Sequence, residues 1–148
     1  MANTKKDYQF ATGKRKSAVA RIRLYEHLPA DFKWGDTEIK KGEVYVNGKL
    51  LQDYFSSDVM KLTATEPLRI ANVVNKYTFT IKVSGGGLAG QLDAVVAALS
   101  NILAKHDVET IRPVLKKKGF LTRDARIRER RKVGTGGKAR RAKQSPKR

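Results

Sequence analysis

The charge of this chain is distributed unevenly, and this limits which part of it can fold. The 148 residues hold 32 Lys and Arg against 14 Asp and Glu, a formal net charge of +18. Residues 1–111 carry +4 of that charge and the last 37 residues carry +14. From Thr122 onward apolar residues are sparse, and such a segment buries too little surface to offset its ordering entropy. We therefore expect a globular body over residues 1–121 and an extended basic tail over residues 122–148.

The composition also excludes several classes of protein. The chain has no cysteine, which rules out a disulfide scaffold and a thiolate metal site and fits a reducing cytoplasm. The longest apolar stretch, from Leu92 to Leu103, contains Asp93 and is too short to span a bilayer. No apolar signal core is visible at the start. We expect no membrane partner, and the positive excess predicts a polyanionic one.

Alternation of apolar and polar residues predicts strands in the body. Residues 17–24 alternate, so one face of this strand should pack while the other presents Arg21 and Arg23. The pair Asn47-Gly48 is typical of a tight hairpin turn. The clearest strand covers residues 77–83. Its predicted inward side chains are Tyr77, Phe79, Ile81 and Val83, and its predicted outward side chains are Thr78, Thr80 and Lys82.

Helical patterns lie between and after these strands. Apolar residues at spacings of three and four predict an amphipathic helix from Leu88 to Leu103 that covers the sheet. A shorter helix is expected near residues 107–119, with Gly119 as its stop. Short helical pieces should follow Ser57 as N-cap and end at Pro67. We expect residues 67–73 to form a strand beside residues 77–83, and residues 28–42, which fit no period, to be a long loop excursion.

The glycine-rich segment "SGGGLAGQ" stands between a predicted strand and a predicted helix, where backbone N–H groups can bind phosphate. A P-loop would need a Lys and a Ser or Thr, but Gly90 is followed by Gln91. A tight turn with close strand–helix approach is therefore favoured over nucleotide binding. A third interpretation, given the charge of the chain, is that Gly85, Gly86 and Gly87 meet an RNA phosphate.

The sequence offers no catalytic or cofactor site. His27 and His106 have no cysteine or third histidine to complete a metal site, and both are expected to be ordinary surface residues. The carboxylates are scattered singly, so no acid–base pair can be named. We expect no enzyme activity, no cofactor, no metal and no small-molecule substrate. A small-molecule kinase and a free nucleic-acid chaperone or DNA-binding protein are the alternatives.

Clustered cations favour a nucleic-acid partner. "TGKRKSAVARIR" combines a glycine turn, three consecutive cations and two arginines on one strand face. The tail is rich in arginine, whose planar guanidinium binds phosphate through two hydrogen bonds and stacks on bases, which favours RNA. Besides Gly85, Gly86 and Gly87, the predicted RNA-binding residues are Lys14, Arg15, Lys16, Arg21, Arg23, Lys116, Lys117, Arg123, Arg126, Arg128, Arg130, Arg131 and Lys132.

Seven sequence blocks, in order and in approximate spacing, resemble the universal ribosomal protein nine family of the small subunit, in its bacterial or plastid form. The resemblance runs from about Tyr8 to Arg148. The blocks are "ATGKRKSAVARIRLYE", "VYVNGKLLQDYF", "EPLRI", "VSGGGLAGQ", "LKKKGFLTRDARIRERRKVG", "KARRA" and the closing "KR".

The resemblance implies an α/β (α+β) two-layer sandwich with a four-stranded sheet covered by helices, similar to the second domain of small-subunit ribosomal protein five. It implies binding to ribosomal RNA in the head of the small subunit, beside other ribosomal proteins, in the cytoplasm of a bacterium or in a plastid stroma. The tail would reach the anticodon stem-loop of the tRNA in the peptidyl site. Carried over by motif, Lys138, Arg140 and Arg141 would lie in the ribosomal RNA, and Lys147 and Arg148 would contact the tRNA.

The chain departs from the family pattern in four places. Val96 and Ala97 replace an Arg-His pair of bacterial members on the long helix, and Ser145-Pro146 stands where an aromatic is usual. The segment before "KARR" is one residue longer than usual, which could shift the tail's reach by about 3 Å. The excursion over residues 28–42 exceeds the short turn of bacterial members.

Overall fold

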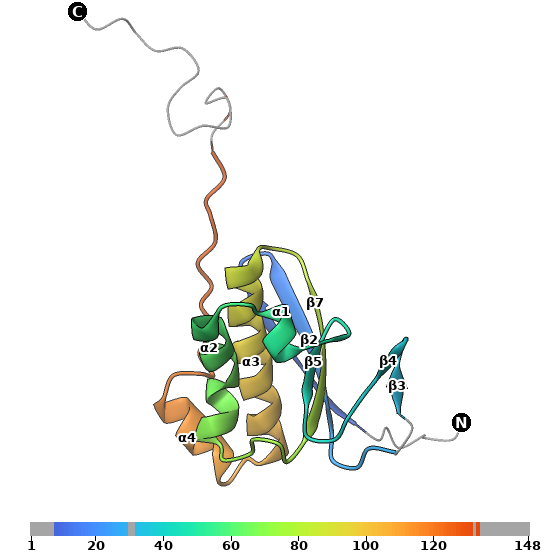
Figure 1. Cartoon of the computed structure of the whole chain (residues 1–148). Coiled ribbons are helices and arrows are strands. Elements are labelled where there is room, and N and C mark those ends of the chain that lie inside the picture. Colours follow the sequence, from blue (N-terminus) through green and yellow to red (C-terminus); the bar gives the residue numbers. More distant parts are fainter. Residues whose placement is uncertain (1–7, 30–31, 132, 134–148) are drawn as a thin grey trace, which may run out of the picture.

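A five-stranded sheet forms one layer of the protein, and helices cover one of its sides (Figure 1). The structure is a computed structural model that describes residues 8–29, 32–131 and 133. The strand order is β1-β2-β7-β5-β6. The strands are β1 (Gln9–Arg15), β2 (Ala18–Tyr25), β7 (Thr78–Ser84), β5 (Val44–Val46) and β6 (Lys49–Leu50).

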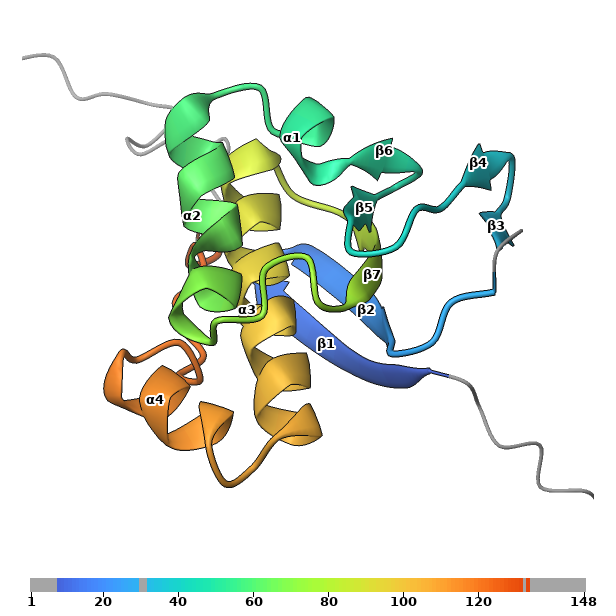
Figure 2. The same ribbon diagram turned by 60° about the horizontal axis from the view of Figure 1, so that its bottom comes forward.

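The helical layer is built around α3 (Leu88–His106), which packs on β1 and β2 (Figure 2). Helix α2 (Asp58–Ile70) lies against α3, and both contact the short helix α4 (Ile111–Lys117). Helix α1 (Leu51–Tyr54) follows β6 at the sheet edge. On the other side of the sheet stands a separate hairpin of β3 (Lys33–Trp34) and β4 (Thr37–Glu38) (Figure 1). Within the described residues, none of these helices has the length and apolarity to cross a membrane.

Strand directions give a mixed α+β fold. β1 pairs antiparallel with β2, and β2 pairs antiparallel with β7. β5 runs parallel to β7 because α1 and α2 carry the chain back between them, and a parallel pair needs such a crossover. The prediction of a four-stranded sheet is wrong, because the sheet has five strands. The fifth is β6, which exists because the Asn47-Gly48 turn folds the chain back onto β5.

The predicted turn at Asn47-Gly48 is confirmed, and the structure adds a reason for the asparagine. Both residues have positive φ, 50° and 82°, as a tight hairpin turn requires. The Asn47 side chain also pairs with the backbone of Val83, donating to its carbonyl at 3.0 Å and accepting from its N–H at 2.8 Å. The turn is therefore tied to β7 as well as to its own hairpin.

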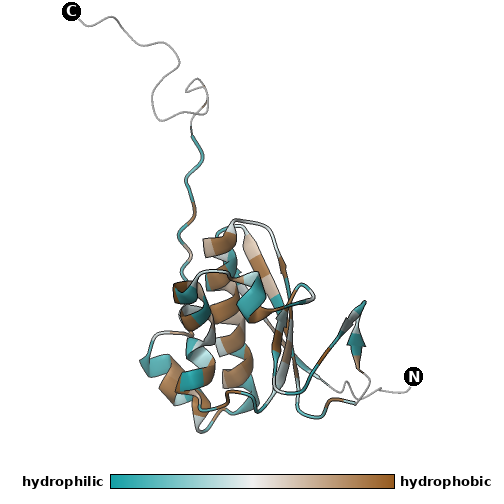
Figure 3. Ribbon diagram, in the orientation of Figure 1, coloured by the Kyte–Doolittle hydropathy of each residue, from teal (hydrophilic) through white to brown (hydrophobic). Residues whose placement is uncertain are grey.

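The main core lies between α3 and the sheet. Ala18, Ala20, Ile22 and Leu24 are buried there, which confirms the predicted inward face of β2. Apolar residues recur along the length of α3 in Figure 3. Gly13 allows the close approach, since a Cβ at this position would collide with the backbone of α3. Gly13 therefore lies in β1, and the predicted glycine turn is wrong. The turn is formed by Lys16, with φ 51°, and the residue after it.

The segment around Pro67 also differs from the prediction. Pro67 lies inside α2, which continues to Ile70, so the expected strand over residues 67–73 does not form. Proline removes one backbone hydrogen bond from a helix interior. Here Pro67 is buried on the same face as Ala64 and Leu68, and tertiary packing of that face outweighs the local cost. Ser57 does occupy the N-cap position, although its side chain makes no capping hydrogen bond.

A second, smaller core lies on the face of the sheet away from α3. Tyr25, Leu28, Ile39 and Tyr45 are buried together there, with Phe32 and Trp34 packed against them. The excursion over residues 28–42 thus folds back over the sheet. It buries Thr78 and Thr80, which were predicted to face solvent. The prediction placed these threonines on the correct face, but nothing in the strand pattern indicates what covers it.

The two C-terminal expectations for the helical layer are confirmed. α3 covers the predicted residues 88–103, and α4 is followed by Gly119 with φ 80°, the left-handed conformation that ends a helix.

His27 is exposed as expected. His106 is not an ordinary surface residue, because it is half-buried at the end of α3. Its ring nitrogens lie 3.1 Å from the Gln9 side-chain amide and 3.0 Å from the Tyr77 hydroxyl.

Candidate nucleic-acid interface

The sheet face away from α3 collects exposed cations from two strands. We call the part of this face on β1, β2 and β7 the open face. Thr12, Arg21 and Lys82 are register partners across these three strands, and Arg21 and Lys82 are both exposed. In the next row Arg23, also exposed, stands opposite Thr80. The alternation in β2 therefore does present both predicted guanidinium groups on one surface.

The open face is hollowed beside the β3–β4 hairpin. The hollow has a volume of about 530 Å³, and its walls come from β1, β2 and β7 together with Trp34 of the hairpin. The described residues that line it include three cations and three aromatic side chains, and none of these residues is acidic. Tyr8, Trp34 and Lys82 were not named by the sequence reasoning as binding residues. The period of two could have found Lys82, which shares its strand face with Thr80, but no local signal places Trp34 here.

Arg15, at the end of β1, has a different environment from Arg21 and Arg23. Its side chain is only 16% exposed and forms ion pairs with Asp93 of α3 at 3.4 Å and with Asp124 at 3.0 Å. Its guanidinium also donates to the backbone carbonyls of Asp124, at 3.4 Å, and Arg126, at 3.0 Å. Arg15 therefore holds residues 124–126 against the end of β1 and the side of α3. We call these contacts the Arg15 fastening.

Asp124 is the acidic centre of this fastening. Hydrogen bonds from the side chain and backbone of Arg126 hold the pKa of the Asp124 carboxyl well below its ordinary value, and the positive charges of Arg126 and Arg15 add to the effect. The Arg126 guanidinium donates to both oxygens of Asp124, at 3.0 and 2.6 Å. Asp124 is one of two acids in the last 37 residues, and it is used to hold two arginines.

Beyond this fastening, the chain leaves the body without helix or strand as far as it is described. Figure 1 shows residues up to 131 running away from the helical layer, and Figure 3 shows them to be mostly hydrophilic. Arg123, Arg126, Arg128 and Arg130 are exposed, and Arg131 is half-buried. The predictions for Lys132, Lys138, Arg140, Arg141, Lys147 and Arg148 fall outside the described residues.

The remaining predicted residues occupy turns and a helix end. Lys14 and Lys16 are exposed near the β1–β2 turn, and Lys116 and Lys117 are exposed in the last turn of α4. The positive charges of Lys116 and Lys117 lie at the negative end of the α4 dipole, which is favourable whether or not RNA is bound. The structure does not bring these lysines into the hollow on the open face.

The glycine-rich turn is explained by packing. Gly85 and Gly86 have φ of 76° and 66°, and a Cβ on Gly85 would come within 2.5 Å of the Ser17 carbonyl oxygen. A Cβ on Gly86 would come within 3.1 Å of the Ala18 side chain. Both glycines therefore let this turn press against the β1–β2 turn. The predicted tight turn is confirmed, but its close contact is with the β1–β2 turn and not between a strand and a helix. Gly87 is exposed at the N-cap of α3 with open space around it.

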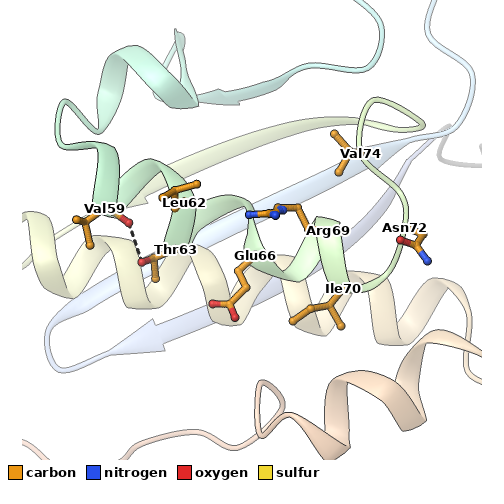
Figure 4. A pocket seen from close by; sticks show the side chains of 8 residues that line it. All are labelled: Val59, Leu62, Thr63, Glu66, Arg69, Ile70, Asn72 and Val74. Carbon is orange, nitrogen blue, oxygen red and sulfur yellow. Dashed lines mark hydrogen bonds between the residues drawn. The ribbon is translucent and has the colours of Figure 1, made fainter.

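A larger hollow, of about 760 Å³, lies on the outer side of α2 (Figure 4). Exposed Val59, Leu62 and Val74 line it, together with Glu66 and Arg69 (Figure 4). This surface is apolar with charges of both signs, so it lacks the unbalanced positive charge of the open face. Across the part of the chain that the structure describes, no three His, Asp or Glu side chains are placed to hold a metal ion.

Comparisons with known proteins place the chain in a family. The sequence model of a family described as ribosomal protein S9/S16 matches residues 13–148, which is most of the chain. The chain belongs to the ribosomal protein S9/S16 family.

Two bacterial relatives show how far the likeness of this S9/S16 chain extends. The small ribosomal subunit protein uS9 of Maridesulfovibrio salexigens is 41% identical over 132 residues, covering 89% of this chain and 91% of the relative. The protein of the same name from Cutibacterium acnes is 41% identical over 138 residues, covering 93% of this chain and 72% of the relative. Family membership confirms the resemblance drawn from the seven sequence blocks.

Proposed function

We propose that the chain is a structural, non-enzymatic constituent of the small ribosomal subunit and that it binds the ribosomal RNA of the subunit head. Membership in the S9/S16 family supports the assignment, since both relatives carry the name of a small-subunit protein. The observation that carries the proposal for this chain is the placement of unbalanced positive charge. Arg21, Arg23 and Lys82 are exposed on one sheet face, in a hollow whose described lining residues include no acid.

We further propose that residues 1–121 form a globular RNA-binding body and that residues 122–148 form an extended basic tail. The tail would run through the ribosomal RNA until Lys147 and Arg148 contact the anticodon stem-loop of the tRNA in the peptidyl site. The Arg15 fastening supports this role because it fixes where the tail begins. A tail that starts from a defined point loses less conformational entropy when RNA orders the rest of it.

The RNA contacts proposed for the body and the tail come from four places. They are the β1–β2 hairpin, the glycine-rich turn, the last turn of α4 and the arginines after residue 122. The Arg15 side chain already pairs with Asp93 and Asp124, so its role toward RNA would be to position the tail. The fold itself is proposed to be similar to the second domain of small-subunit ribosomal protein five. Neighbouring ribosomal proteins of the head complete the proposed partners.

The tail proposal is tested with small subunits that contain the protein lacking Lys147 and Arg148. The affinity of tRNA for the peptidyl site should fall, because charge-assisted hydrogen bonds to phosphate are lost. The amount of protein that co-sediments with the subunits should not change, because the body remains. The control carries Gln144→Ala and Ser145→Ala, which alter the same part of the chain without changing its charge. Unchanged tRNA affinity after the deletion would overturn the tRNA role, and failure of the full chain to co-sediment would overturn the ribosomal one.

A further inference from the structure

The hollow on the open face has a feature that folding alone does not explain. Arg21 and Lys82 are direct register partners on neighbouring antiparallel strands. Like charges in this position repel, so the pair lowers the stability of the sheet. Among the described residues neither side chain forms a hydrogen bond or an ion pair, and the lining of the hollow contains no acid. An anion between the two side chains would remove the repulsion.

Aromatic side chains stand beside these cations. Trp34 is half-buried where the β3–β4 hairpin meets the hollow. The Arg23 guanidinium lies 4.7 Å from the centre of the Tyr8 ring, and this contact holds its planar fork in place. Tyr8 in turn packs on Tyr25, with ring centres 5.8 Å apart, and Tyr25 packs on Phe32 at 5.0 Å. We call Tyr8 and Trp34 the aromatic wall of the hollow. Both side chains pack against the second core of the protein, which supports the wall.

We propose that this hollow binds one unpaired nucleotide of RNA, with its phosphate between Arg21 and Lys82 and its base stacked on the aromatic wall. The inference rests on the proposed function, because it assumes that RNA is the polyanion. Bases stack on aromatic side chains when they are splayed out of a helix, whereas paired bases are already covered on both faces. A volume of about 530 Å³ is in the range of sites for single small ligands and is too small for a duplex.

The combination of groups favours a nucleotide over an acidic side chain of a neighbouring protein. A carboxylate would use the cations and leave the aromatic wall without a partner. A nucleotide uses both, since its phosphate pairs with the cations and its base has a flat face for stacking. Thr12 shares the row of Arg21 and Lys82 and adds a hydroxyl group of the kind that contacts phosphate and sugar oxygens.

Trp34 is the only tryptophan of the chain, which makes its fluorescence a reporter of this hollow. The full-length protein is titrated with short single-stranded oligoadenylate and, separately, with the same strand annealed to oligouridylate. Quenching of Trp34 follows occupation of the hollow. Anisotropy of a dye on the RNA follows binding to any part of the protein, including the tail. We expect the single strand to quench Trp34 and the duplex to raise the anisotropy with little quenching.

The double variant Arg21→Ala, Lys82→Ala tests the phosphate position. The concentration of oligoadenylate that gives half-maximal quenching should rise about tenfold, and the slope of log affinity against log salt should shrink by about 0.7, the share of one neutralised phosphate. The control is Lys49→Ala, an exposed lysine of β6 that does not line the hollow. Both cations of the double variant are exposed, so thermal unfolding should show that it folds.

Each result separates this inference from the proposed function. Quenching by the single strand that is weakened in the double variant and kept in Lys49→Ala supports the nucleotide site. An anisotropy increase without quenching, or equal quenching by the duplex, overturns the site and leaves RNA binding in place. No anisotropy change with any RNA overturns the proposed function itself. Quenching by polyglutamate at the same concentration as by RNA overturns the nucleotide assignment in favour of an acidic protein neighbour.

Discussion

The two faces of one sheet are built for different partners. On the face toward α3, small residues and Gly13 let the helix approach so closely that a single Cβ would collide with its backbone. On the open face, charged and aromatic side chains surround a hollow, and two cations face each other without an acid. The first face is saturated by contacts within the chain. The second keeps charges that no described residue neutralises, as expected of a surface that binds an anion.

Two arginines of the same hairpin show the same contrast on a smaller scale. Arg15 is 16% exposed and has two carboxylates and two backbone carbonyls as partners. Arg21, six residues later, is exposed and has no ion-pair partner among the described residues. Both were predicted to bind RNA from the same sequence block. The structure separates them into one that holds residues 124 and 126 and one that has no ion-pair partner among the described residues.

The largest expected effect is at the helix-covered face. Gly13→Ala should lower the free energy of unfolding by about 3 kcal/mol, because the new Cβ collides with the backbone of Ala94 and Ala98 and cannot turn away. Denaturant unfolding measures the change. Gly87→Ala is the control, since a Cβ there meets open space at an extended backbone position, and it should change stability by less than about 0.5 kcal/mol. Equal effects of the two variants would contradict the close packing of α3 on β1.

The next effect concerns the Arg15 fastening. Arg15→Ala should speed amide hydrogen exchange in residues 122–126 by about fivefold, because the ion pairs and hydrogen bonds that hold this segment are lost. Exchange measured on peptides from this segment tests the prediction. Arg69→Ala, an exposed arginine of α2, is the control and should leave exchange there unchanged. Unchanged exchange in Arg15→Ala would mean that the ion pairs do not hold the tail.

The Arg15 fastening should weaken only at low pH, as the Asp124 carboxylate becomes protonated. The folded pKa of Asp124 lies below its ordinary value of about 3.9, so its contribution is fully present above that value and is lost as the pH falls toward the folded pKa. Protection of residues 122–126, corrected for intrinsic exchange, should be constant from pH 8 to about pH 5 and decline below about pH 4. Asp124→Asn should remove the pH dependence. A loss of protection already at pH 6 would contradict the assignment to Asp124.

The smallest effect is expected on the open face. Lys82→Ala should raise the free energy of unfolding of the RNA-free protein by a few tenths of a kcal/mol, because it removes a like charge directly opposite Arg21. Thermal unfolding at low salt measures this, and high salt should reduce the gain by screening the repulsion. Lys49→Ala should bring no gain of this kind, since Lys49 pairs with Val46 rather than with a cation. A clear loss of stability in Lys82→Ala would show that the lysine has a structural partner.

Local chemistry predicted the parts of the fold that depend on short-range rules. The alternation in β2, the Asn47-Gly48 turn, the apolar stripe of α3 and Gly119 after α4 each act within one element, and each is confirmed. Pro67 was misplaced because its helix is stabilised by a buried face, and this long-range gain is invisible in the residues around a proline. The β3–β4 hairpin was missed because each strand is two residues long, too short to show a period.

The candidate site was predictable to a similar extent. Arg21 and Arg23 follow from the alternation of one strand. The partner of Arg21 on β7 and the role of Trp34 follow from which segments meet in three dimensions, and no local pattern records that. The engagement of Arg15 with Asp124, more than a hundred residues away, is of the same kind.

We expect the RNA of the small subunit to cover the open face of the sheet and not to contact the protein through α4 and the tail alone. A structure by electron cryomicroscopy of a small subunit containing this chain shows directly which surfaces the RNA covers. We expect phosphate oxygens within about 3 Å of Arg21 and Lys82, an unpaired base on the aromatic wall, and the Arg15–Asp124 ion pair in place. An open face in solvent or covered by another protein, with RNA on α4 and the tail alone, would contradict this expectation.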